Sequence, residues 1–280
     1  MIHRSFLVCL ACVSALQAPL FKSGVETVRV DVLVTRDGRP VPDLGPEDFE
    51  VFDSGVPQRI DHAAFGNIAL NVVIAIDASS SIQGEREQRL RQACDRLLRR
   101  LRGEDEVGLV VFGDPVVIRS RLTRNLSAVR AAVDMPFPLG QTALVDAVQA
   151  SIVTANSGIG RALVLVFSDG IEVSSYLSPN AVLETAKLSD AVVYGVSLRA
   201  DRQRPSFLRE VAEASGGSLV EIASPDQIEA TFERVLEEFR HRYVLSYTPT
   251  GVEPTGWHEL KVRVKQRGAS VKARAGYVKE

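Results

Sequence analysis

The sequence from residue 71 to residue 81 reads NVVIAIDASSS, and from residue 162 to residue 170 it reads ALVLVFSDG. Each stretch contains an unbroken apolar run, 72–76 or 162–167, without the polar alternation of a strand that faces water on one side. Such runs are typical of parallel strands that helices cover on both faces. Asp77 follows the first run directly and Asp169 follows the second run after Ser168, each in a loop of small and polar residues. The two stretches therefore predict buried strands of an α/β sheet with polar loops at their carboxyl ends.

The zone around these stretches alternates between apolar strands and amphipathic helices. Strands are predicted at 71–76, 107–112, 116–122, 162–167, 191–197 and 218–222. Helices are predicted at 84–101, 126–133, 143–154, 178–188, 206–214 and 225–239. Only a Gly-Asp-Pro turn separates strand 107–112 from strand 116–122, which indicates one antiparallel edge strand. We therefore expect the α/β fold class, with a doubly wound, mostly parallel sheet.

The sequences on both sides of this zone are β-rich. Between residues 26 and 65, Val28, Val30, Val32 and Val34 alternate with other residues. After the zone, strands are predicted at 243–247, 258–265 and 271–277. Neither flank has enough strands to bury a core alone, so we expect the two flanks to form one smaller, discontinuous β-sandwich subdomain. The expected division is a signal peptide at 1–23, a β segment at 24–66, the α/β domain at 67–240 and a second β segment at 241–280.

The amino-terminal sequence has the layout of a secretory signal peptide. His3 and Arg4 precede an apolar run over 6–16, and the small residues Ala15 and Ala18 follow as alternative cleavage points. The run is too short for a membrane span, so we expect no integral membrane segment. We therefore expect a secreted protein, or one of the periplasm or cell envelope.

Composition and charge exclude several functions. The chain has 280 residues and a formal net charge of −2, which does not favour nucleic acid as a partner. Its four histidines are scattered, with no pair at the spacing of zinc ligands. Once the signal peptide is removed, Cys94 is the only cysteine, and it falls on the apolar face of helix 84–101. We expect Cys94 to be an inert core thiol.

One set of side chains carries the chemistry of the chain. Asp77, Ser79 and Ser81 follow one strand, Asp169 follows another, and Thr142 precedes a helix. Loops at the carboxyl ends of parallel strands converge on the crevice where such sheets bind ligands. Carboxylates and hydroxyls without imidazole or thiolate suit Mg²⁺, Mn²⁺ or Ca²⁺. Taken singly, Asp77 or Thr142 could be a helix N-cap and Asp169 a turn residue, so the prediction depends on the joint order of the five.

The order Asp77-x-Ser79-x-Ser81, Thr142, Asp169 resembles the metal-ion-dependent adhesion site of von Willebrand factor type A domains. The sequence segments VIAIDASSS, GQTALVDAV and VLVFSDG are similar to the corresponding segments of bacterial members. The resemblance implies that Ser79, Ser81 and Thr142 contact the metal, while Asp77 and Asp169 act largely through water. Gln141 stands where a glycine is frequent, a departure that should be tolerated. The β-rich flanks are similar to those of a bacterial exported subfamily.

The resemblance implies a non-catalytic, adhesion-type module in which the metal accepts a Glu or Asp carboxylate from a protein partner. One alternative is an envelope protein whose metal only stabilises the fold. A Mg²⁺-dependent phosphatase with an aspartate nucleophile is the enzymatic alternative. It would need a second carboxylate two residues after Asp77, where Ser79 stands. We therefore expect no enzyme.

Overall fold

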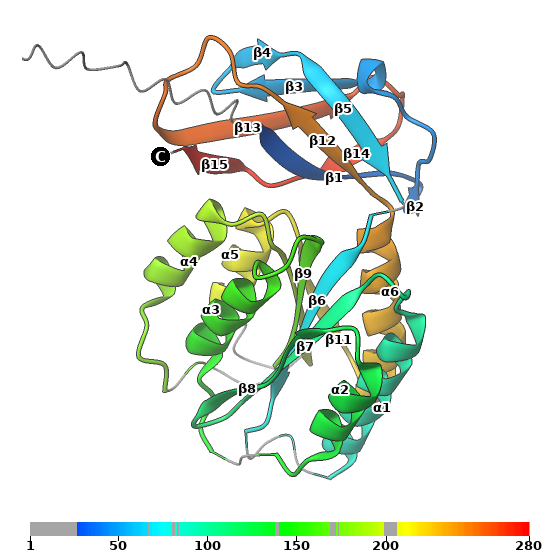
Figure 1. Ribbon diagram of the computed structural model, residues 1–280, viewed down its shortest axis with the longest axis vertical. Coiled ribbons are helices and arrows are strands. Elements are labelled where there is room, and N and C mark those ends of the chain that lie inside the picture. Colours follow the sequence, from blue (N-terminus) through cyan, green and yellow to red (C-terminus); the bar gives the residue numbers. More distant parts are fainter. Residues whose placement is uncertain are drawn as a thin grey trace, which may run out of the picture.

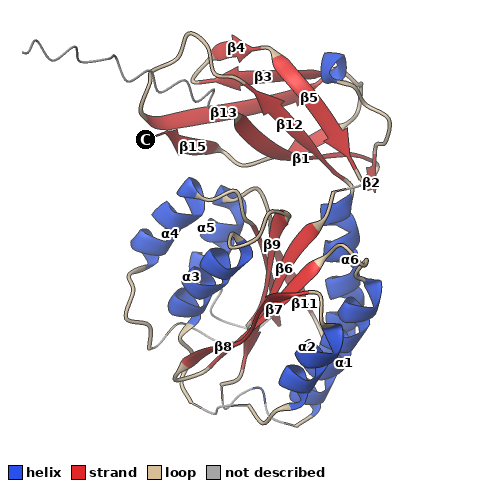
Figure 2. Ribbon diagram, in the orientation of Figure 1, coloured by secondary structure: helices blue, strands red, loops and turns tan. Residues whose placement is uncertain are grey.

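The computed structural model describes residues 27–66, 68–79, 82, 84–137, 140–168, 172, 174–198 and 206–279. The signal peptide expected at 1–23 lies outside these residues. An α/β domain and a β-sandwich lie one above the other, joined where helix α6 meets strand β12 (Figures 1 and 2). Within the described part of the chain, no helix is long and apolar enough to cross a membrane.

A six-stranded sheet forms the centre of the α/β domain. Its strands are β6 (Leu70–Asp77), β7 (Glu106–Phe112), β8 (Val116–Thr123), β9 (Arg161–Phe167), β10 (Val192–Leu198) and β11 (Leu219–Ile222), in the order β11-β10-β9-β6-β7-β8. All neighbours are parallel except β8, which pairs antiparallel with β7. The predicted mixed sheet with one antiparallel edge strand is therefore confirmed.

Helices cover both faces of this sheet. They are α1 (Glu85–Arg100), α2 (Leu126–Asp134), α3 (Leu144–Ala155), α4 (Pro179–Leu188), α5 (Ser206–Ala214) and α6 (Ile228–Arg240). Residues of α1, α2 and α6 share one core with Val72, Ile74 and Ile76, whereas α3, α4 and α5 share the other with Val73 and Ala75. Successive β6 side chains thus enter opposite cores, which is why the strand shows no polar alternation. The helix expected at 225–239 begins instead as a 3₁₀ turn (Pro225–Gln227) that leads into α6.

The two flanks form one β-sandwich, as expected from their strand count. Its strands are β1 (Val28–Arg36), β2 (Arg39–Pro40), β3 (Phe49–Asp53), β4 (Val56–Gln58), β5 (Ile60–Phe65), β12 (Arg242–Tyr247), β13 (Gly256–Val264), β14 (Ser270–Lys272) and β15 (Gly276–Lys279), with a 3₁₀ turn at Pro46–Asp48. One sheet has the order β14-β1-β12-β5 with β2 beside β1, and the other has the order β15-β13-β3-β4. Strand β12 lies between β1 and β5, and β13 pairs with β3, so each sheet combines both flanks. The exact residue limits of the domains stay a prediction.

A buried polar cluster links the two sheets of the sandwich. The carboxylate of Asp53 is fully buried and accepts hydrogen bonds from the hydroxyls of Tyr247 and Tyr277, both at 2.8 Å. Its other oxygen lies 2.7 Å from Nδ1 of His258, which is also buried. Because a buried carboxylate is costly without donors, these three partners make Asp53 compatible with an apolar core. Trp257 of β13 is 46% exposed and therefore lies outside this buried cluster.

Replacing Asp53 with alanine should lower the free energy of unfolding by about 3 kcal/mol or more, because His258 and two tyrosine hydroxyls lose their buried acceptor. Urea denaturation followed by circular dichroism measures this change. Glu50→Ala is the matched control, since Glu50 is exposed on the same strand. Equal stability of the two variants would contradict the role given to Asp53.

Cys94 lies inside the core beneath α1. Its side chain is fully buried and forms no disulfide. Burial raises the pKa of the thiol from 9.0 to about 12, because the thiolate would lose its hydration. The thiol therefore stays protonated throughout the physiological pH range.

We expect Cys94 to resist alkylation in the native protein at pH 8, where about one thiol in ten thousand would be ionised. The same reagent should label it rapidly in denaturant, where the ordinary pKa returns. Mass spectrometry after iodoacetamide treatment distinguishes the two states. Native labelling at the denatured rate would show that Cys94 is accessible.

Candidate metal centre

Asp77 is the last residue of β6 and is fully buried. Its Oδ1 accepts a hydrogen bond from the backbone N–H of Ser79 at 2.8 Å, and this bond turns the chain sharply away from the sheet. The amide of Ala78 still donates to the carbonyl oxygen of Phe112 on β7. Helix α1 has Gly84 as its N-cap and no side-chain cap. Asp77 is therefore an acceptor within its own turn and does not cap α1.

Strand register brings the loop after β9 to the same carboxylate. Ile76 pairs with Phe167, so the next residues, Asp77 and Ser168, lie side by side. The Ser168 hydroxyl donates to Oδ2 of Asp77 at 2.7 Å, and both side chains are fully buried. Asp77 thus holds Ser79 and Ser168, which follow two neighbouring strands. Asp169 comes directly after Ser168 but lies outside the described residues.

Thr142 reaches the same end of the sheet through a close backbone contact. A side chain on Gly140 would come within 2.8 Å of the backbone nitrogen of Asp114, so this loop packs tightly on the turn between β7 and β8. Thr142 follows with only 5% of its surface exposed, whereas Gln141 is exposed. The N-cap of α3 is Ala143, without a side-chain bond of its own. Thr142 is therefore not the N-cap.

Glu172 supplies the cap of α3, a role the sequence analysis did not identify. Its Oε2 accepts from the backbone N–H of Val145 at 2.9 Å and from the hydroxyl of Ser175 at 2.8 Å. Its Oε1 accepts from the backbone N–H groups of Ser174 and Ser175 at 2.9 and 2.7 Å. A carboxylate at a helix N-terminus is favoured because it meets unpaired N–H groups and the positive end of the helix dipole. Glu172 thereby ties the loop after β9 to the helix that Thr142 precedes.

Asp146 of α3 also holds the loop after β9 by hydrogen bonds. Its two carboxylate oxygens accept from the backbone N–H groups of Tyr176 and Leu177, each at 2.9 Å. No spacing rule links Glu172 or Asp146 to their partners, because the contacts depend on how α3 packs beside β9. Only the acidic residues near the start of a helix could have served as a signal.

Three of the five predicted metal-site residues are therefore described by the structure. Asp77, Ser79 and Thr142 each lie at the carboxyl end of the sheet with 5% or less of their surface exposed, and a hydrogen bond joins the first two. Ser81 and Asp169 lie outside the described residues. The described part of the chain holds no group of three His, Cys, Asp or Glu residues suited to a metal. The predicted set does not depend on such a group, because it has only two carboxylates among five oxygen donors. Carboxylates and hydroxyls held at adjacent loops fit a hard divalent cation.

Comparison with known families gives one match, which lies in the α/β domain. Residues 72–172 match the model of the von Willebrand factor type A domain. Such domains generally act as non-catalytic interaction modules. The matched region begins in β6 and ends at Glu172, and it thus spans the three loops described above. No curated protein sequence matches the chain.

Solved structures share the fold at low sequence identity. A von Willebrand factor type A protein from Catenulispora acidiphila is 13% identical, with a TM-score of 0.55, over 92% of this chain and 75% of that one. Proximal thread matrix protein 1 from the mussel byssus, solved with zinc in its metal-ion-dependent adhesion site, is 17% identical with a TM-score of 0.56. That match covers 66% of this chain and 49% of the mussel protein, so the chain spans about half of its length.

Glu172→Ala should lower the stability of the protein by about 1 kcal/mol, because α3 loses its cap. It should also weaken Mg²⁺ binding, since the loop after β9 is no longer tied to the helix after Thr142. Thermal denaturation and calorimetric titration with Mg²⁺ measure the two effects. Glu210→Ala, an exposed change on α5, is the control and should alter neither. If Glu172→Ala had the stability and the Mg²⁺ affinity of this control, Glu172 would not have the role described here.

Proposed function

We propose that the chain binds a partner protein through a divalent cation held by Asp77, Ser79, Ser81, Thr142 and Asp169. The supporting observation is the buried carboxylate of Asp77, which holds the Ser79 amide and the Ser168 hydroxyl in fixed positions. Such preorganisation lowers the cost of ordering the loops around an ion. Mg²⁺ or Mn²⁺ is the proposed cation, with Ca²⁺ as a further candidate.

Each residue has a distinct role in this proposal. The hydroxyls of Ser79, Ser81 and Thr142 are the ligands of the ion, while Asp77 and Asp169 orient its water. Ser168 acts as a positioning residue because it holds the carboxylate of Asp77. Three hydroxyl ligands leave about three of six positions to water, and few protein charges neutralise the ion.

The bound cation supplies a positive charge that a Glu or Asp carboxylate of the partner can reach by displacing water. The buried side chains of Asp77 and Thr142 face the ion and not the partner, so the exposed parts of the three loops provide the remaining contacts. This arrangement gives binding without a chemical step, in line with the general behaviour of the family. We further propose that the protein works outside the cytoplasm, in secreted form or in the periplasm or cell envelope.

Asp77→Ala should weaken Mg²⁺ and Mn²⁺ binding by at least about tenfold, as loss of an orienting partner does at other metal sites. Asp77→Asn keeps a hydrogen-bond acceptor and lacks the charge, so it separates folding from metal affinity. Calorimetric titration beside circular dichroism gives both quantities. Wild-type affinity in both folded variants would refute the site.

Partner capture tests what the metal is for. The wild-type protein should retain a partner from the native extracellular or periplasmic fraction in Mg²⁺, and should lose it in EDTA and in Thr142→Ala. Thr142→Ala should affect this binding more than the melting temperature. Binding that survives EDTA while the melting temperature falls would identify a purely stabilising metal. Hydrolysis of phosphatase or protease substrates that disappears in Asp77→Ala would instead identify an enzyme.

A further inference from the structure

A cleft of about 560 Å³ lies at the junction of the β-sandwich and the α/β domain. Arg29, Asp31 and Val244 line it from β1 and β12, while Arg161 and Asp190 line it from the α/β domain. The junction is where β6 and β9 begin, whereas the candidate metal centre lies where these strands end. The cleft is therefore separate from the proposed metal site.

Arg161 brings an unused donor to this cleft. Its Nε donates to Oδ1 of Asp31 at 2.9 Å, and its Nη2 donates to the carbonyl oxygen of Phe239 at 3.2 Å. Its Nη1 is buried and has no hydrogen-bond partner among the described residues. The whole residue is only 8% exposed. A buried donor without a partner is unfavourable, so an acceptor that reaches Nη1 gains a hydrogen bond that no described residue makes.

The charges around the cleft leave a positive excess. Asp31 is paired with Arg161, and Asp190 lies 2.9 Å from Nη1 of Arg274. Arg29 is exposed and forms no ion pair with any residue that the structure describes. Arg29, which has no ion-pair partner among the described residues, and Nη1 of Arg161 therefore favour an anion, and planar guanidinium groups suit a carboxylate.

Apart from Asn156 and two glycines, the remaining residues that line the cleft are aliphatic. Ile68, Ala162 and Ile159 contribute aliphatic surface, and Ile159 is 99% exposed. The loop beside them is held by Asn71, whose Nδ2 donates to the carbonyl oxygens of Ala155 and Gly160, both at 3.2 Å. A side chain on Gly160 would come within 2.6 Å of Asn71, so this loop cannot pack closer.

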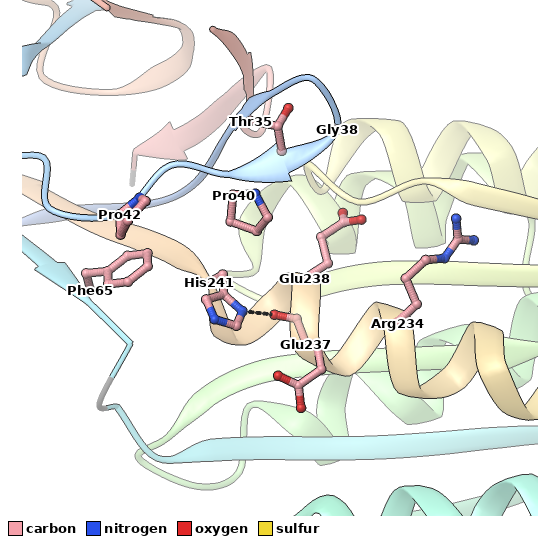
Figure 3. A pocket seen from close by; sticks show the side chains of 9 residues that line it. All are labelled: Thr35, Gly38, Pro40, Pro42, Phe65, Arg234, Glu237, Glu238 and His241. Atoms are coloured by element: carbon pink, nitrogen blue, oxygen red, sulfur yellow. Dashed lines mark hydrogen bonds between the residues drawn. The ribbon is translucent and has the colours of Figure 1, made fainter.

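A second cavity of the same volume lies at the junction and has different chemistry (Figure 3). Pro40, Pro42 and Phe65 form one wall, and Glu237 and Glu238 of α6 lie opposite. The carboxylate of Glu238 already accepts a hydrogen bond from Tyr194 at 2.5 Å. Because Glu237 and Glu238 line the second cavity, an anionic ligand should prefer the cleft lined by Arg29 and Arg161.

We propose that the cleft between Arg29, Arg161 and Ile159 binds the carboxylate of a small apolar acid. The carboxylate meets the two guanidinium groups, and the aliphatic body lies on Ile68, Ala162 and Ile159. Two sources offer this chemistry: a free short-chain fatty acid and the carboxyl-terminal residue of a peptide. Because the cleft and the metal centre lie at opposite ends of the sheet, this binding does not need a divalent cation.

Ligand-detected NMR and calorimetric titration of the full chain test the proposal with three probes. N-acetyl-leucine represents a peptide carboxyl terminus, hexanoate represents a fatty acid, and N-acetyl-leucine amide is the neutral control. We expect at least one acid to bind at least tenfold more tightly than the amide, equally well in Mg²⁺ and in EDTA. The acid that binds more tightly identifies the source. Equal binding of acids and amide, or binding of neither acid, would overturn the proposal.

Variants place the bound acid within the cleft. Arg29→Gln should weaken acid binding at least fivefold, and Ile159→Glu should do the same through charge repulsion. Both residues are exposed, so the fold should persist. Arg36→Gln removes the same charge from the far end of β1 and should leave binding unchanged. Wild-type affinity in both cleft variants would place the ligand elsewhere and refute the assignment. Loss of acid binding leaves the proposed metal function intact, since the latter is measured by Mg²⁺ titration.

Discussion

The fully buried carboxylate of Asp77 is the constraint on which the functional end of the molecule depends. It terminates the central strand β6, fixes the turn to Ser79 and holds Ser168 on the neighbouring strand. A charged group can occupy this position only because donors from two loops surround it. The burial of β6 on both faces in turn fixes where Asp77 lies. The packing of β6 in the sheet therefore also determines the positions of Ser79 and Ser168.

Much of the fold could be predicted from sequence because it depends on local patterns. Unbroken apolar runs identified β6 and β9, and the short turn before Val116 identified the antiparallel edge strand. The pairing of the flanks followed from a count of strands that could not bury a core alone. The buried cluster of Asp53, His258 and Tyr277 could not be predicted, because it joins residues from three separate strands that no local pattern relates.

The candidate site also has residues that could be predicted from the sequence and residues that could not. Asp77, Ser79 and Thr142 could be named because their order along the chain is distinctive, and the structure finds all three buried at one end of the sheet. Ser168 and Glu172 were not named as part of the site. Their roles depend on strand register and on the packing of α3, which are tertiary properties. The motif thus identified the residues proposed to surround the ion more readily than Ser168 and Glu172, which hold them in position.

The interleaved flanks have a consequence for the order of folding. Strand β1 lies near the start of the described chain, yet its neighbour β12 is made only after the whole α/β domain. The hydrogen bond between Leu44 and Tyr243 spans 199 positions, a separation that would make direct closure entropically slow. The α/β domain removes most of this cost, because β6 begins and α6 ends at the same side of its sheet. Once that domain has folded, the two flanks emerge side by side and pair as if joined by a short loop. Pairing of the two flanks in the sandwich therefore reports that the α/β domain has brought its two ends to the same side.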